Sequence, residues 1–203
     1  MAKTKIGIIG AGSFGIALAW LLNNNGHTVT VWTRRPDQAE RLTQAHGNPD
    51  KLPGVTLPDS VRFTSDPAEA VAEAAAVILV VPSVSIRETA RLLQPHLPEG
   101  ALVVDCAKGL EEDTLKPLST VITEELSDRK ARVVVLSGPS HAEEVGRGMP
   151  TAIVAASEDP DAARAVQTIF MNPVFRVYTS EDMRGVELGG ALKNVIALAA
   201  GIA

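Results

Sequence analysis

The stretch KIGIIGAGSFGIALAWLLNNNGHTVTVWTRR, from Lys5 to Arg35, decides the fold of this chain. It predicts a strand, a glycine-rich turn, an apolar helix and a second strand. Gly10, Gly12 and Gly15 have the G-x-G-x-x-G spacing. In that spacing the first glycine permits a tight turn, the second lets backbone approach a pyrophosphate, and the third lets the helix pack close to the strand. Because a strand precedes the glycines and an apolar helix follows, a dinucleotide site is the first hypothesis. A glycine turn without a ligand is the alternative.

The start of the predicted helix offers groups that bind phosphate. Ser13 and Phe14 open the helix, where free backbone amides and the helix dipole favour negative charge. We therefore expect these two residues to face the phosphates of a cofactor, together with the three glycines.

Two arginines bear on which dinucleotide is bound. A site that prefers NAD usually carries Asp or Glu about 20 residues past the glycines. This chain has Arg34 and Arg35 there, and no carboxylate before Asp37. A guanidinium can hold a 2′-phosphate with two hydrogen bonds and stack on adenine. The sequence therefore favours NADPH, with NADH as the second choice, and solvated surface arginines are the alternative.

Composition limits the classes of function. The 203 residues suffice for one sizeable core and the start of a second domain, and 45% hydrophobic with 21% charged residues is typical of a soluble globular protein. A net charge of -5 gives no electrostatic footprint for nucleic acid. We expect no membrane span, because no uninterrupted apolar stretch reaches the necessary length. We expect no metal site either, because no pair of histidines with spaced carboxylates is found.

The single cysteine and the N-terminal sequence point to the cytoplasm. Cys106 excludes an intrachain disulfide and fits a reducing compartment. It ends a predicted strand, so a buried, inert thiol is expected rather than a nucleophile. The first residues, MAKTKIGIIG, lack the apolar segment of a signal peptide.

Strands and helices alternate along the chain, which predicts an α/β fold: a doubly wound, mostly parallel Rossmann sheet with extra strands, followed by the start of a helical domain. After residue 35, strands are predicted at 61–64, 76–82, 101–105, 132–137, 151–156 and 175–180. Helices are predicted at 37–45, 67–75, 86–93, 114–126, 161–169 and from about 182 to the chain end. We expect a dinucleotide-binding domain at 1–181 and the first helix of a truncated, all-helical substrate domain at 182–203. That helix ends in VIALAAGIA, which is apolar on all sides and must be covered by a partner chain or by the rest of a larger protein. We favour the second reading.

Two segments after predicted strands carry polar groups to the same crevice, outside the carboxyl ends of the strands. In DCAKGLEEDT, Lys108 supplies a cation that can hold an anionic or carbonyl oxygen, and a plain turn is the alternative. In LSGPSHAEEVGRG, Gly138 begins a turn, and Ser140 to Ala142 can open a helix with free amides. His141 is read as an incidental loop histidine, because no carboxylate is placed to orient it as a base.

The segment VELGGALKNVIALAAG contains the most unusual helix pattern. Gly189 and Gly190 each cost roughly 1 kcal/mol relative to alanine inside a helix. Helical spacing places them on one face with Lys193 and Ala197. Such a strip would let a nicotinamide or small substrate approach the backbone while the lysine, with its pKa lowered by desolvation, acts as a proton donor. A packing seam with a solvent-reaching lysine is the alternative.

Taken together, GAGSFGIALA, VVPS, AKGLE, LSGPSHAEE and GVELGGALKNVIALAAGI resemble the bacterial NAD(P)H-dependent glycerol-3-phosphate dehydrogenases over essentially the whole chain. The resemblance implies reversible reduction of dihydroxyacetone phosphate, a phosphorylated triose, to sn-glycerol 3-phosphate for phospholipid synthesis in the cytoplasm. It also allows a homodimer. By position, the implied cofactor contacts are Ser13, Phe14, Arg34, Arg35, Lys108 and Ala142. The implied substrate contacts are Lys108, Gly138, Ser140 and Lys193, with Lys193 and Lys108 catalytic.

The chain departs from this family at two points. Lys51 stands where members often carry an aromatic residue or histidine, so the resemblance gives no cofactor contact there. The family also continues into a helical domain that supplies Asp, Arg and Asn residues to the glycerol phosphate. The chain is therefore expected to bind NADPH better than it turns over. An NAD(P)-binding regulatory module, a related reductase of the 6-phosphogluconate-dehydrogenase-like superfamily and a structural oligomerisation unit remain as alternatives.

Overall fold

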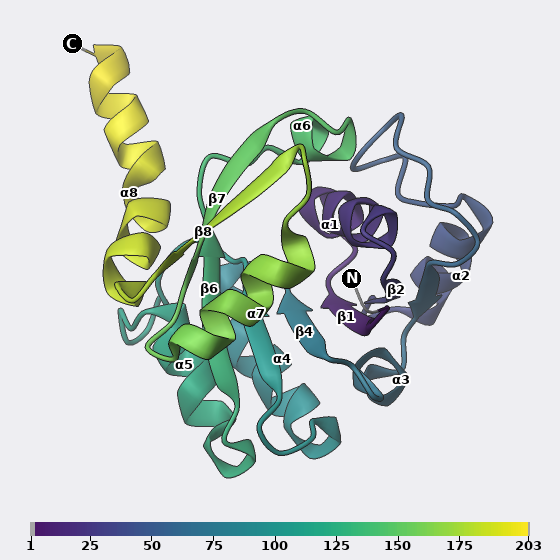
Figure 1. The fold of residues 1–203 in the computed structure, drawn as a ribbon, viewed down its shortest axis with the longest axis horizontal. Coiled ribbons are helices and arrows are strands. Elements are labelled where there is room, and N and C mark those ends of the chain that lie inside the picture. Colours follow the sequence, from purple (N-terminus) through teal and green to yellow (C-terminus); the bar gives the residue numbers. More distant parts are fainter. Residues whose placement is uncertain (1–2, 203) are drawn as a thin grey trace.

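One eight-stranded sheet runs through the computed structural model, which describes residues 3–202 (Figure 1). The bounds 1 and 203 of the two expected domains lie outside the described residues. The strand order is β3-β2-β1-β4-β5-β6-β7-β8. The strands are β1 (Lys5–Ile9), β2 (Thr28–Trp32), β3 (Arg62–Thr64), β4 (Ala76–Leu79), β5 (Leu102–Asp105), β6 (Arg132–Ser137), β7 (Thr151–Ala156) and β8 (Phe175–Ser180).

Strand direction changes once across the sheet. Strands β1 to β6 are mutually parallel in the order 3-2-1-4-5-6, which is the Rossmann arrangement. Strand β7 pairs antiparallel with β6, and β8 pairs parallel with β7. The predicted doubly wound, mostly parallel sheet with extra strands is confirmed.

Helices cover both faces of the sheet. The helices are α1 (Ser13–Asn24), α2 (Pro36–Gln44), α3 (Pro67–Val71), α4 (Ile86–Leu93), α5 (Leu118–Glu125), α6 (Ala142–Gly146), α7 (Pro160–Phe170) and α8 (Met183–Ile202), with 3-10 turns η1 (Ser83–Ser85), η2 (Gln94–His96) and η3 (Ser127–Arg129). Buried side chains of α1, α2, α6 and α7 share one apolar cluster, and those of α3, α4 and α5 share another. Since both faces are covered, the central strands are continuous apolar runs, such as Ala76–Leu79 in β4.

Three predicted elements are shorter by three or more residues in the structure, for local reasons. Helix α3 ends at Val71, and Glu73 then adopts a positive φ of 55°. Helix α5 starts at Leu118 rather than at residue 114, because Leu115 has a φ of 57° and the chain folds back before Pro117. Strand β4 ends at Leu79, three residues before Pro82, which cannot donate to a sheet.

Helix α8 projects from the body of the molecule (Figure 1). Among its described residues only Glu187 is buried. Large apolar side chains along it are exposed, among them Val195, Ile196 and Leu198. By length and composition this helix could cross a membrane, although Arg184, Glu187 and Lys193 interrupt its apolar sequence. One such helix is weak evidence for a span.

Candidate functional site

The crevice where the strand order reverses lies between the carboxyl ends of β1 and β4. Gly10 follows β1 with a φ of 122°, and a Cβ there would lie 2.5 Å from the carbonyl oxygen of Val80. Only glycine fits this close approach of two backbone segments. At Gly12, by contrast, a Cβ would meet nothing within 4 Å, so backbone is open to an approaching ligand. Gly15 faces inward, where a Cβ would lie 2.0 Å from the Gly10 oxygen. The three glycines therefore play the separate roles expected from their spacing.

Helix α1 begins at this crevice, and no side chain of its own caps or balances the partial positive charge at its N-terminus. Gly12 is the N-cap and makes no side-chain cap, and no acidic residue stands in the first turn. The first amides of the helix are thus available to an anion, and the dipole favours one there.

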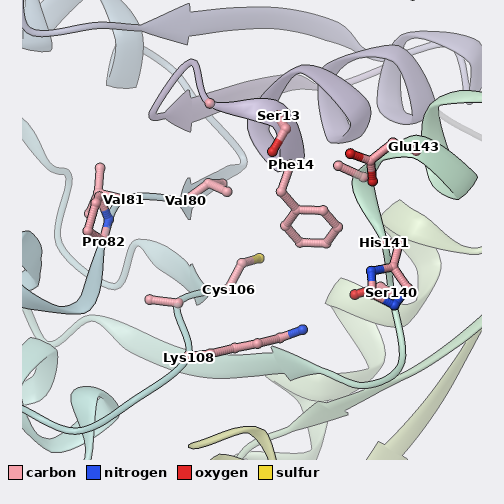
Figure 2. A pocket seen from close by; sticks show the side chains of 13 residues that line it. Ser13, Phe14, Val80, Val81, Pro82, Cys106, Lys108, Ser140, His141 and Glu143 are labelled. Atoms are coloured by element: carbon pink, nitrogen blue, oxygen red, sulfur yellow. The ribbon is translucent and has the colours of Figure 1, made fainter. Parts of the chain in front are cut away.

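Two cavities meet at the glycine turn and share Gly12 and the segment 80–82. The larger, about 470 Å³, is lined by Gly12, Ser13, Phe14, Val80, Val81, Pro82, Cys106, Ala107, Lys108, Ser140, His141, Ala142 and Glu143 (Figure 2). The smaller, about 310 Å³, is lined by Gly10, Ala11, Gly12, Trp32, Thr33, Arg34, Gln38, Asn48, Lys51, Val80, Val81, Pro82, Ser85 and Thr89. A groove of two halves that join beside a helix N-terminus suits a ligand whose two halves join at a pyrophosphate.

The smaller cavity carries cations at its rim. Arg34 lines it, and the Arg34 guanidinium also lies 3.1 Å from the exposed carboxylate of Glu88. Arg35 is not among the lining residues, and its Nε lies 3.9 Å from a carboxylate oxygen of Asp37. Lys51 does line this cavity, although the sequence analysis assigned it no contact. The structure therefore brings one of the two predicted arginines to the groove, with a lysine nearby.

The loop that carries Lys51 is tied to the glycine turn by a buried asparagine. The Asn48 amide donates to the carbonyl oxygen of Ala11 at 2.7 Å. Its own Oδ1 is buried and has no partner among the described residues. Nothing in the sequence marked this residue, because one asparagine in a Pro/Gly-rich loop has no distinctive pattern.

The larger cavity gathers the strand-end residues predicted from the sequence. In Figure 2 the Lys108 side chain extends toward Ser140 and His141, and the Cys106 sulfur faces Phe14. Lys108 Nζ donates to the carbonyl oxygen of Gly138 at 3.3 Å. Burial lowers the pKa of Lys108, and the nearby charge of Lys193 lowers it further. Cys106 is buried as expected, and burial raises the pKa of its thiol.

Helix α8 lies against Lys108 but does not line either cavity. A Cβ at Gly190 would lie 2.8 Å from Ser137 Oγ and 3.8 Å from Lys108 Cγ, so this glycine permits close packing. A Cβ at Gly189 would meet nothing within 4 Å, so only the Gly190 part of the predicted glycine strip packs against the sheet and Lys108. Lys193 is exposed, and its ammonium donates to Asn194 Oδ1 at 2.9 Å. Gly138 does not line the cavity and contributes its carbonyl group to Lys108.

Two buried carboxyl groups that no sequence motif marks are Glu187 on α8 and Asp105 at the end of β5. Glu187 accepts from the backbone N–H and the hydroxyl of Ser119, at 2.9 and 2.6 Å, and so fastens α8 to the start of α5. Asp105 accepts from the Ala107 N–H at 2.9 Å, and its other oxygen has no partner among the described residues. Burial, followed by the charge of Glu187, raises the pKa of Asp105 to about 7.

Comparison with known proteins connects this geometry to one family. Residues 5–163 match the sequence model for the NAD-dependent glycerol-3-phosphate dehydrogenase N-terminus, and residues 182–203 match the model for the C-terminus. The chain is 54% identical over 201 residues to a Moorella thermoacetica protein and 51% identical over 199 residues to one of Fusobacterium nucleatum, both named glycerol-3-phosphate dehydrogenase [NAD(P)+]. It covers 59% of the length of each, while 99% and 98% of this chain are matched.

Solved structures agree with the sequence matches. The crystal structure of glycerol-3-phosphate dehydrogenase from Coxiella burnetii superposes with a TM-score of 0.91 at 32% identity, covering 98% of this chain and 61% of that one. The enzyme GPD1 from Saccharomyces cerevisiae superposes with a TM-score of 0.85 at 27% identity, over 98% of this chain and 63% of that one.

The buried Asp105 makes the stability of the fold depend on pH. An aspartate ionises near pH 3.9 when unfolded, whereas Asp105 holds its proton in the fold up to about pH 7. Stability from this group is therefore complete below pH 3.9 and is lost as the pH rises toward 7. We expect Asp105→Asn to remove this loss. The difference in free energy of unfolding between the variant and the wild type should therefore be larger at pH 8 than at pH 4.5, in favour of the variant, by roughly 1–4 kcal/mol.

Urea denaturation at the two pH values measures this difference. Asp113→Asn, which changes an exposed aspartate of the following loop, is the control and should give none. If the free energy of unfolding of Asp105→Asn depended on pH as that of the wild type does, the raised pKa of Asp105 would be contradicted.

Proposed function

Because the chain belongs to the NAD-dependent glycerol-3-phosphate dehydrogenase family, we propose that it binds NADPH, with NADH as the second choice, and serves the reversible reduction of dihydroxyacetone phosphate to sn-glycerol 3-phosphate. The observation that carries the proposal is the position of Lys108. Its ammonium lies in the cavity that begins at the glycine turn, against the Gly138 carbonyl and under the helix that bears Lys193.

The residues of the groove fit a dinucleotide phosphate. Open backbone at Gly12 and the free first turn of α1, with Ser13 and Phe14, would hold the pyrophosphate. The smaller cavity would take the adenosine half, and Arg34 and Lys51 at its rim would hold a 2′-phosphate. Arg35 would contribute only if its side chain left Asp37. The larger cavity, with Ala142 in its wall, would take the nicotinamide half.

The chemistry that NADPH supplies when bound is hydride transfer to a carbonyl carbon. The residues of the chain act on the oxygen of that carbonyl, where negative charge develops. Lys193 would give this oxygen a proton, and Lys108 would stabilise it as a second cation. Burial lowers the pKa of Lys108, and repulsion from the Lys193 ammonium lowers it further. The anionic substrate would relieve this repulsion, while Ser140 and the Gly138 backbone orient it.

The division of the chain follows from the same proposal. Residues 1–181 would form the dinucleotide-binding domain, and residues 182–203 the first helix of a helical substrate domain. In support, the sheet ends at Ser180 and α8 begins at Met183, and the two family models match on either side of this point. We therefore interpret the apolar surface of α8 as a domain contact and not as a membrane span. A cytoplasmic enzyme that feeds phospholipid synthesis is the setting this function implies.

The preference for NADPH depends on Arg34. Arg34→Ala removes a charge-assisted contact with the 2′-phosphate, so NADPH should bind about 10–100-fold more weakly while NADH binding changes less than about twofold. Isothermal titration of the 203-residue chain with both cofactors measures this. Arg35→Ala is the matched control and should have the smaller effect, because Arg35 does not line the groove. If Arg34→Ala lost affinity for NADPH and NADH equally, the proposed contact between Arg34 and the 2′-phosphate would be contradicted.

The proposed reaction depends on Lys193. We expect the chain to bind NADPH and to oxidise the NADPH slowly when dihydroxyacetone phosphate is added, because the relatives extend well beyond the region matched here. Lys193→Ala should lower this oxidation at least about 100-fold, a typical share for general acid catalysis. NADPH affinity should stay within about twofold, because Lys193 does not line the groove. Absorbance at the nicotinamide band follows the reaction, and an unchanged rate in the variant would exclude the proton-donor role.

A further inference from the structure

The loop at residues 107–117, between β5 and α5, is a closed unit with Lys108 near its beginning. Leu110 and Pro117 form an antiparallel bridge across it. The Glu111 N–H donates to the Lys116 carbonyl at 3.0 Å, and the Leu115 N–H donates to the Glu111 carbonyl at 2.8 Å. The closed part, residues 110–117, begins two residues after Lys108, so a group that holds Glu111 fixes the chain directly next to Lys108.

Arg87 holds Glu111 from outside the loop. Its Nε and Nη2 donate to the two carboxylate oxygens of Glu111 at 2.6 and 2.8 Å, which is a two-bond pairing. The same guanidinium pairs with Glu125 and, at 3.1 Å, with Glu124, both in or next to the last turn of α5. Only 25% of the Arg87 side chain is exposed, so solvent screens these contacts less than at an open surface.

Arg87 also connects this loop to the groove. It stands in the first turn of α4, directly after residues 80–85, of which Val80 and Val81 line both cavities. The two segments touch a second time, because a Cβ at Gly109 would lie 3.3 Å from Ser83. Lys108 is thus confined by β5 on one side, and on the other by contacts at Gly109 and Glu111.

We propose that Arg87 is a positioning residue that, by gripping Glu111, keeps the Lys108 ammonium inside the larger cavity against the Gly138 carbonyl. Its importance for catalysis rests on the function proposed for Lys108, but the placement of Lys108 can be measured without any ligand. Arg87 also lowers the pKa of Glu111 to about 2, so the grip persists throughout the neutral range.

Arg91 provides a matched control. One turn further along α4, it makes a similar two-bond pairing, at 2.8 and 3.0 Å, with Glu125. Among the described residues, Arg91 makes no hydrogen bond or ion pair with Glu111 or with any other residue of the loop. Loss of Arg91 therefore removes a comparable α4–α5 ion pair while leaving the grip on the loop in place.

The test follows the Lys108 ammonium directly. In protein with 13C-labelled lysine side chains, the Lys108 signal is assigned by its absence in Lys108→Arg and titrated by NMR. In Arg87→Gln the Lys108 pKa should rise toward its ordinary value by about half a unit or more, because the released side chain becomes hydrated. Arg91→Gln should leave the Lys108 pKa unchanged. Arg87→Lys, which cannot make the two-bond pairing, should give a Lys108 pKa between those of the wild type and Arg87→Gln.

A second readout connects placement to binding. NADPH should bind at least about fivefold more weakly to Arg87→Gln, and within about twofold of the wild type to Arg91→Gln. If Arg87→Gln does not fold, Glu111→Gln serves instead and should shift the Lys108 titration in the same direction. The proposal is overturned if the Lys108 titration is unmoved in a folded Arg87→Gln or Glu111→Gln variant, or if Arg91→Gln moves it equally. Failure of the wild type to bind NADPH would overturn the proposed function instead, while the titration still decides the role of Arg87.

Discussion

The close contact of backbone between Gly10 and Val80 is the constraint on which the rest of the site depends. It occurs where the chain leaves β1 and β4 in opposite directions, so the carboxyl ends of these strands enclose a crevice. A side chain at Gly10 would separate the two segments that form the floor of both cavities. The same turn starts α1, whose free amides then face the join between the cavities. One steric condition therefore shapes the groove and places its anion-binding end.

The second half of the site depends on anchors that lie outside the groove. Glu187 fixes α8 to the start of α5 through two hydrogen bonds from Ser119, and Gly190 lets the helix lie against Ser137 and Lys108. Arg87 fixes the loop on the other side of Lys108. Helix α8 and Arg87 of α4, both distant from Lys108 in sequence, thus pack or pair around the segment that carries it. The two carboxylates involved, Glu187 and Glu111, line neither cavity.

The sequence predicted the fold and the groove because both follow from local patterns. The apolar runs, the glycine spacing and the strand-end positions of Lys108 and Ser140 are visible without tertiary information. What it missed depends on side chains that meet only after folding. The buried Asp105, the tie from Asn48 to Ala11 and the Arg87–Glu111 pair combine residues that carry no motif of their own. The sequence pattern also gave Arg34 and Arg35 the same role, whereas in the structure Arg35 caps α2 near Asp37 and only Arg34 of the two lines the cavity.

The central claim is that a dinucleotide lies across the glycine turn with its nicotinamide beside Lys108 and its adenosine beside Arg34. Intermolecular NOEs in the complex of the 203-residue chain with NADPH test this most directly. We expect NOEs from the nicotinamide protons to Phe14 and the Lys108 side chain, and from the adenosine protons to Arg34. Nicotinamide NOEs to the side chains around Arg34, or NOEs confined to residues outside both cavities, would contradict it.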